Sequence, residues 1–115
     1  YKLDRIGLDG AKLRASNLSR ISLYRAKLEN VDLRNADLSH ADLREANLRG
    51  ARLDGARLEW TKLDGADLQG ASLRGADLSG ANVVSVNWES IKHDKDTIFP
   101  FANFQLPTSN PKGTT

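Results

Sequence analysis

The chain has 115 residues, with 17 lysines and arginines against 15 aspartates and glutamates and a formal net charge of +2. This length suits a single domain, and so small a charge does not by itself indicate a nucleic-acid partner. The absence of cysteine excludes a disulfide framework, a thiol nucleophile and a thiolate metal site, and no apolar run approaches the roughly 18 residues of a membrane span.

From the N-terminus, a leucine returns every five residues without interruption from Leu3 to Leu78. A small or β-branched residue, most often alanine, stands two positions before nearly every leucine, and the other positions are mostly polar, charged or glycine. On an α-helix, five residues advance by about 500°, which would scatter the leucines over every face. On a flat strand, five residues reverse the face each time. The pattern therefore predicts a solenoid whose backbone turns a corner within each unit, so that every leucine points towards one axis.

The charges bear on how many units complete one coil. Stacked coils place equivalent residues about 4.7–4.9 Å apart, so opposite charges are expected above one another. Through residue 92, a separation of fifteen residues gives twelve opposite and three like pairs, twenty gives ten and three, and twenty-five gives eight and seven. Charge pairing excludes coils of five units and leaves three or four units open.

The units "ADLSH", "ADLRE", "ANLRG", "ADLQG" and "ADLSG" resemble the pentapeptide-repeat family, whose pattern is A(D/N)LXX. The resemblance extends over residues 1–90 and implies an all-β fold, a right-handed β-helix solenoid with four sides and one pentapeptide per side, here of about five coils. Members abound in cyanobacteria, in the cytoplasm or exported to the periplasm or thylakoid lumen. The chain begins with Tyr1 rather than methionine, so we expect a processed or trimmed form whose compartment stays open between these.

After Trp88 the repeat is interrupted at "IKHDKDTIFPFANFQLP". Thr97-Ile98-Phe99 and Ala102-Asn103-Phe104 restore the pattern displaced by one residue, which predicts a bulged corner with one extra residue within Lys92–Asp96. Trp88, Phe99 and Phe104 are expected to close this end, because a solenoid must cover its last coil. We therefore predict a β-helix over residues 1–106, with an aromatic cap at about 88–106, and a flexible tail at 107–115.

The N-terminal end shows no such cap. We expect either an upstream segment there or an end that docks against something. The oligomeric state is accordingly expected to be a monomer or a weak end-to-end dimer.

The polar residues do not form a catalytic or metal-binding pattern. Ser39 adjoins His40, but neighbouring residues at a corner diverge and cannot form a nucleophile–base pair. His93, Asp94 and Asp96 lie close together without the spacing of a calcium loop or a zinc site. The sequence predicts no enzyme, no cofactor and no metal.

With four units per coil, the charges are unevenly shared between the sides. One side carries a net charge of +4 and another a net charge of −2. The positive side consists of Lys12, Arg14, Arg34, Arg52, Arg74 and Lys92 against Asp32 and Asp54. Nucleic acid is not favoured as its partner, because aromatic stacking groups are absent from it. Arg14, Arg34 and Arg74 are instead candidate residues for binding a protein partner.

Trp60 is a conspicuous outward aromatic. Four-sided stacking places it in a column with Arg20, His40 and Gly80, where Gly80 leaves room for the ring and His40 is expected to stack on the indole. Exposed tryptophan is enriched at interfaces. Arg20, His40 and Trp60 are therefore a second set of candidate partner-binding residues.

These features predict a rigid, non-enzymatic scaffold or interaction module that binds an unidentified protein partner through the flat faces of the β-helix. The alternative is suggested by relatives in the pentapeptide-repeat family that imitate duplex DNA and bind type II topoisomerases. That mimicry requires a strongly negative surface, whereas this chain is mildly positive.

Overall fold

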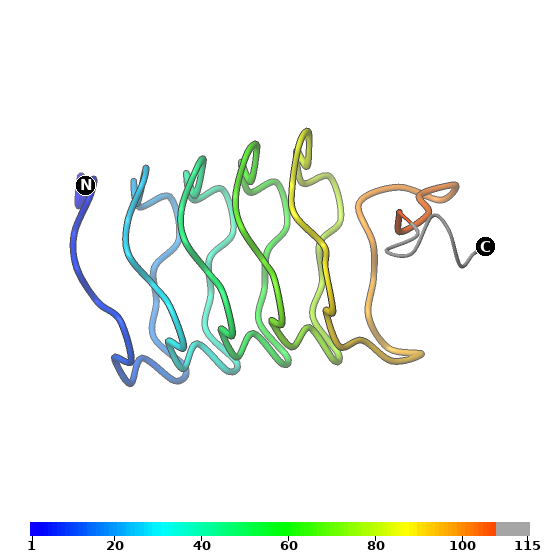
Figure 1. Cartoon of the computed structure of the whole chain (residues 1–115), viewed down its shortest axis with the longest axis horizontal. Coiled ribbons are helices and arrows are strands. Elements are labelled where there is room, and N and C mark those ends of the chain that lie inside the picture. Colours follow the sequence, from blue (N-terminus) through cyan, green and yellow to red (C-terminus); the bar gives the residue numbers. More distant parts are fainter. Residues whose placement is uncertain (108–115) are drawn as a thin grey trace.

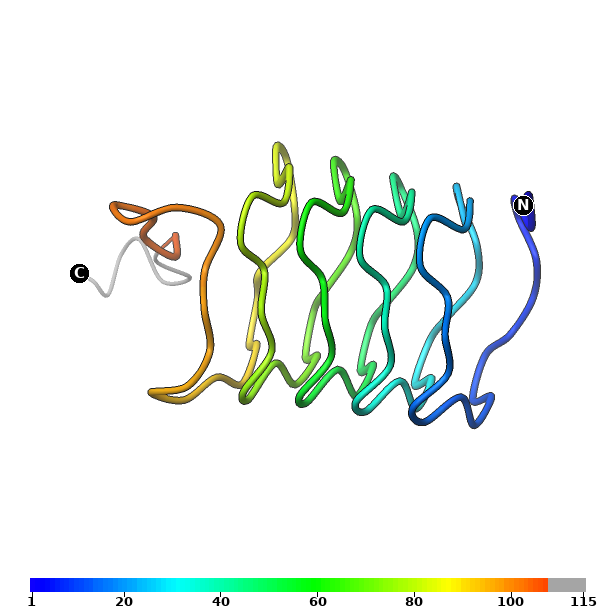
Figure 2. The same cartoon turned by 180° about the vertical axis from the view of Figure 1, so that it is seen from behind.

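The computed structural model describes residues 1–107, which wind into a stack of coils with the N-terminus at one end (Figure 1). Those residues form no α-helix and no continuous strand; each side of a coil contributes a single parallel β-bridge. The bridges join residue n to residue n+20, from Lys2↔Ser22 to Ser72↔Lys92. A coil therefore takes twenty residues, which are four five-residue units, and the view from behind shows the same even stacking (Figure 2).

The corners are β-turns that follow each leucine. The amide three residues after the leucine donates to the leucine carbonyl, as Ala26 does to Leu23 at 3.0 Å. The residue two after the leucine has a positive φ at every corner from Arg5 to Ser90, which is the geometry of a type II turn. Glycine fills seven of these positions and other residues fill eleven, including Trp60 at φ 60°, so the stack imposes this conformation even where a side chain disfavours it.

Backbone hydrogen bonds join neighbouring coils on every side. In the middle of the stack, the Leu23 amide donates to the Asp42 carbonyl at 2.7 Å, and the Asp42 amide donates back to the Ile21 carbonyl at 2.9 Å. The same exchange repeats along the stack, so backbone polar groups beside the core have partners.

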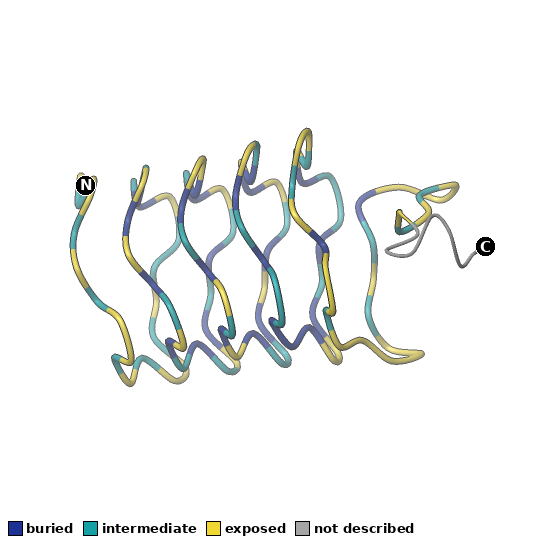
Figure 3. Cartoon of the chain, viewed as in Figure 1, coloured by how far each residue is buried: buried dark blue, intermediate teal, exposed yellow. Residues whose placement is uncertain are grey.

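The leucines point inward and form the core, as the sequence predicts. From Leu23 to Leu78 each leucine is at most 2% exposed, and buried residues run through the middle coils while both ends are more exposed (Figure 3). At the N-terminal end Leu3, Leu8 and Leu13 are only partly buried. With neighbouring leucines and isoleucines they line an apolar opening of about 170 Å³.

The regular register changes once, near the C-terminal end. Ser72 pairs with Lys92, but Asp77 pairs with Ile98, twenty-one residues away, which confirms the predicted extra residue. At this corner the Asp94 carboxylate accepts from the Gly75 amide at 3.0 Å. Elsewhere in the stack a backbone carbonyl accepts from the equivalent amide.

The aromatic residues of the C-terminal end contact one another. The Trp88 ring lies 6.4 Å from the Phe99 ring and 5.2 Å from the Phe104 ring, centroid to centroid, and the two phenylalanine rings are 5.3 Å apart. Trp88 is 8% exposed. Of the predicted flexible tail, residues 108–115 lie outside the described residues.

Candidate functional site

The largest concentration of positive charge lies on one side of the stack, which we call the basic face. It comprises the outward side chains of residues 11–14, 31–34, 51–54, 71–74 and 91–94. Asp94, which the charge count from the sequence omits, also belongs to it. The basic face thus carries six cations and three carboxylates, a net charge of +3 rather than +4.

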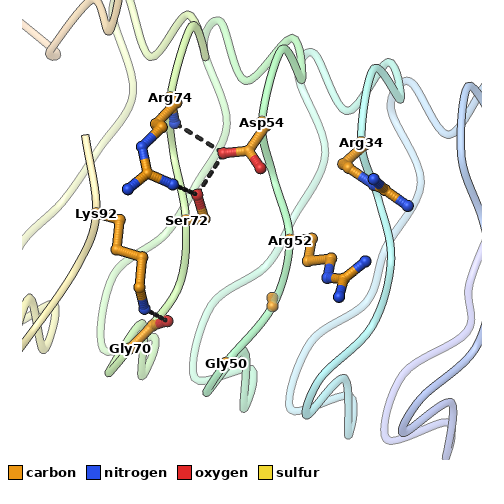
Figure 4. A pocket seen from close by; sticks show the side chains of 9 residues that line it. Arg34, Gly50, Arg52, Asp54, Gly70, Ser72, Arg74 and Lys92 are labelled. Carbon is orange, nitrogen blue, oxygen red and sulfur yellow. Dashed lines mark hydrogen bonds between the residues drawn. The ribbon is translucent and has the colours of Figure 1, made fainter. Parts of the chain in front are cut away.

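A shallow groove runs over this face. A depression of about 430 Å³ is lined by Arg34, Arg52, Asp54, Ser72, Arg74 and Lys92, with Gly50, Ala51 and Gly70 beneath them. Figure 4 shows Arg34 and Arg52 on its N-terminal side and Arg74 and Lys92 on its C-terminal side. A second depression of about 420 Å³ continues past Lys12 and Asp32 and shares Gly50 and Arg52 with the first. We call the two together the basic groove.

The groove is open because its edge follows a corner column that is rich in glycine. Gly10, Gly50 and Gly70 occupy that column on three of its coils. A Cβ atom added to Gly70 would meet only the Gly50 amide nitrogen, at 4.0 Å. The absence of a side chain at Gly70 leaves the backbone accessible beside the cations, whereas the Asn30 side chain lies over Gly50.

The cations of the groove differ in how they are neutralised. Arg34 donates two hydrogen bonds to Asp32, from Nε to Oδ1 at 2.8 Å and from Nη2 to Oδ2 at 2.7 Å. These hydrogen bonds from Arg34 are the main reason that the pKa of Asp32 lies well below its usual range. Arg34 and Asp32 therefore neutralise each other.

Three other cations of the first depression have no carboxylate partner within residues 1–107. The Arg52 side chain makes no hydrogen bond or ion pair in this part of the chain. The Arg74 guanidinium contacts Ser72 Oγ at 3.4 Å, and Lys92 Nζ contacts the Gly70 carbonyl at 3.4 Å. Because all three side chains are exposed, they can accept an external anion without breaking an ion pair.

The predicted candidates fall only partly in this groove. Arg34 and Arg74 line it, whereas Arg14 belongs to the basic face but not to the groove lining. Arg52 and Lys92 were counted in the charge of the face but not chosen as binding residues. The spacing of forty residues between them in one column was the signal that could have identified them.

The second predicted set lies along one corner column. Arg20, His40 and Trp60 each occupy a corner position with positive φ, and the Trp60 side chain is 60% exposed. A Cβ atom added to Gly80 would collide with the Trp60 indole, so the ring lies over Gly80, as expected.

The predicted stacking of His40 on this indole is wrong: among residues 1–107, the aromatic contacts do not include His40. Asn30 reaches over Gly50 and Glu45 over Gly65, so these corner side chains, like that of Trp60, lean towards residue n+20.

The residues considered for chemistry have structural contacts. The Ser39 hydroxyl donates to Asp37 at 2.7 Å rather than to His40. Asp94 accepts backbone hydrogen bonds at the bulged corner, and although burial opposes ionisation, the hydrogen bonds from Gly75, Asp96 and Thr97 lower its pKa. Within residues 1–107, no cluster of three potential metal ligands is found. A helix of the length and apolarity required to cross a membrane is likewise missing from these residues.

The geometry agrees with comparisons to known proteins. A family model for pentapeptide repeats matches residues 8–44, 21–59 and 51–87. The crystal structure of alr5209, a pentapeptide repeat protein from Nostoc PCC 7120, is 46% identical, with 77% of each chain covered and a TM-score of 0.66. The pentapeptide repeat protein Rfr23 from Cyanothece 51142 is 32% identical, with 85% of this chain and 87% of that chain covered and a TM-score of 0.54.

These likenesses show that the stacked coils are a β-helix solenoid. QnrB1, a plasmid-mediated fluoroquinolone resistance protein, is more distant: it is 21% identical over 77% of this chain and 57% of that chain, with a TM-score of 0.38. Among curated proteins, none matches the chain.

Proposed function

The chain belongs to the pentapeptide-repeat family, and we propose that it is a non-enzymatic interaction module that binds a protein partner on its basic face. The observation that supports this most is the set of three exposed cations, Arg52, Arg74 and Lys92, that line one groove without a carboxylate partner among residues 1–107. Surface cations without an internal role raise association rates and select an oppositely charged partner.

We also propose that the solenoid is a right-handed, four-sided β-helix of about five coils over residues 1–106, with an aromatic cap at about 88–106. The twenty-residue spacing of the bridges and the contacts among Trp88, Phe99 and Phe104 support it. Such a scaffold is suited to binding because each cation is held in register by hydrogen bonds between coils.

The alternative of a DNA mimic that binds type II topoisomerases has less support. Mimicry of duplex DNA needs an extended negative surface, whereas the groove of this chain is positive. A supercoiling assay with DNA gyrase separates the two proposals: a mimic inhibits the enzyme, and a module that binds an acidic partner leaves it active.

Affinity capture from a lysate of the source organism tests the proposed surface. The native protein is compared with the variant R52Q/R74Q/K92Q and with the control variant R5Q/K27Q/K62Q, which removes the same charge from exposed residues outside the basic face. Circular dichroism and thermal unfolding first establish that all three proteins fold. We expect a protein that the native and control forms retain and the groove variant loses.

Other outcomes reject the proposed surface. If all three forms retain the same protein, binding lies elsewhere, and W60A then tests the Trp60 column. If only nucleic acid is recovered, the partner class is wrong. If none of the forms retains anything, a purely structural role, or end-to-end association through the apolar N-terminal opening, replaces the proposal.

A further inference from the structure

The cations of the basic groove form a regular row. Lys12, Arg52 and Lys92 occupy one column of bridged positions, in which Asp32 and Ser72 stand between them. Neighbouring coils are about 4.8 Å apart, so successive cations of this row are about 9.5 Å apart. We call these three residues the cation row.

The two residues between the cations already have partners. Asp32 accepts both hydrogen bonds from Arg34, and the Ser72 hydroxyl donates to Asp54. A ligand that follows the row therefore passes a cation, then Asp32 or Ser72, whose side chain is already hydrogen-bonded, and then the next cation. Anionic groups about 9.5 Å apart would each contact a cation. An anionic group halfway between two cations would add little binding energy, and beside Asp32 it would be repelled.

The groove also determines the direction of the ligand. Its two depressions share Gly50 and Arg52 and follow the stack axis, and the bare backbone at Gly70 lets a chain approach closely. A narrow, extended chain parallel to the axis fits this shape better than a compact molecule.

An extended peptide can match the spacing. In a polyproline II conformation each residue rises about 3.1 Å, and every third side chain returns to the same face, about 9.3 Å further on. We propose that the cation row binds an extended acidic segment of a partner protein that carries a carboxylate at every third residue. This inference rests on the proposed function and adds the chemistry and spacing of the bound segment.

Nucleic acid matches the groove less well. Each strand of a duplex presents a phosphate about every 3.4 Å along the axis, so phosphates would lie beside Asp32 as well as beside the cations. Single strands are held by stacking of bases on aromatic rings, and His93, at the C-terminal end, is the one aromatic residue in the described part of the basic face, where its ring packs against Phe99. A peptide can place uncharged residues opposite Asp32.

Fluorescence anisotropy with labelled synthetic peptides tests the inference. The spaced peptide is Glu-Pro-Ala-Glu-Pro-Ala-Glu, and the clustered peptide Glu-Glu-Glu-Pro-Ala-Pro-Ala has the same composition and charge. The proteins are the native chain, the variant K12Q/R52Q/K92Q and the control R5Q/K27Q/K62Q. A seven-nucleotide oligothymidine is the nucleic-acid probe.

We expect the native and control proteins to bind the spaced peptide, more tightly than the clustered one and more weakly as salt increases. The row variant should bind it about tenfold more weakly, the effect of losing three exposed charge pairs. Equal affinity for the two peptides overturns the spacing, equal loss in row and control variants overturns the site, and tighter binding of oligothymidine overturns the partner class.

Failure of this inference can be told apart from failure of the proposed function. If no peptide binds, but R52Q/R74Q/K92Q still loses the captured protein, the acidic segment is rejected and the basic face stands. If the peptides fail and capture is the same with all forms, both proposals are rejected.

Discussion

The middle coils and the C-terminal end of this solenoid maintain their register in different ways. Between Leu23 and Leu78, identical backbone hydrogen bonds and fully buried leucines repeat every five residues. At the bulged corner an extra residue breaks the repeat. The Asp94 carboxylate replaces the backbone carbonyl that would accept from the Gly75 amide, and the Thr97 hydroxyl adds a hydrogen bond to the Leu73 carbonyl. Many outward side chains of the middle coils can therefore vary without loss of register, whereas the C-terminal end requires specific side chains.

The largest effect is expected from shortening a leucine in the middle coils. Leu48→Ala should lower the free energy of unfolding by about 2–5 kcal/mol, because Leu48 is fully buried and the cavity cannot close. Leu8→Ala should cost clearly less, since Leu8 lies beside the N-terminal opening. Urea unfolding measures both. Equal losses would show that the N-terminal end and the middle are packed alike.

A corner glycine beneath a large side chain should be the next most sensitive position. Gly80→Ala must displace the Trp60 indole, whereas Gly70→Ala meets only a backbone nitrogen at 4.0 Å. Both incur the positive-φ strain of about 1–2 kcal/mol, so Gly80→Ala should cost more. Adding Trp60→Ala should bring the Gly80→Ala cost down to the Gly70→Ala value; if it does not, the indole is not what Gly80 accommodates.

The bulged corner should depend on a single hydroxyl. Thr97 Oγ1 donates to the Leu73 carbonyl at 2.8 Å and accepts from the Asp94 amide at 3.0 Å. Thr97→Val keeps the shape and should cost about 1 kcal/mol of unfolding free energy. Thr61→Val is the control, because Val31 already fills an equivalent position and the Leu58 carbonyl keeps its bond from the Thr61 amide. Equal effects would contradict a special role for the corner.

A smaller effect is expected from acid. Hydrogen bonds, chiefly from Arg34, Ser39 and Arg44 respectively, lower the pKa of Asp32, Asp37 and Asp42. A carboxyl whose pKa is lower in the folded chain stabilises it above the unfolded pKa of about 3.9, and this contribution is lost as pH falls below that value. The melting temperature should therefore fall between pH 5 and pH 2, and Asp32→Asn should flatten the fall. A melting temperature independent of pH over this range would show that these three carboxylates do not stabilise the fold through their ionised form.

The leucine period predicts a solenoid, whereas the β-helix with four units per coil was predicted from the resemblance to the pentapeptide-repeat family and not from the charges. Charge pairing left three and four open because most ion pairs do not join equivalent positions of successive coils. Among residues 1–107, Arg34–Asp32, Arg44–Asp42 and Arg57–Glu59 pair residues two apart in one coil, whereas Arg25–Glu45 spans twenty residues and Arg49–Asp67 spans eighteen. Opposite charges do stand above one another in the bridged columns, as Asp42 and Lys62 do, but most of the close ion pairs lie within one coil.

The candidate site could be predicted in charge but not in shape. Arg34 and Arg74 were identified from the uneven sharing of charge between sides, and both line the groove. The groove itself depends on Gly50 and Gly70 lying in one column beside Arg52, which requires the twenty-residue register. The direction in which corner side chains lean, seen where Trp60 lies over Gly80, follows from backbone geometry that a residue pattern does not contain.

The twenty-residue coil determines which residues share a face, and cysteine pairs test it most directly in a chain that has no cysteine of its own. Arg57 and Asp77 are bridged neighbours, at a spacing compatible with a disulfide. We predict that R57C/D77C forms an intramolecular disulfide under mild oxidation and that K62C/D77C, fifteen residues apart, does not. A disulfide in K62C/D77C alone would contradict the four-unit coil, and with it the basic face.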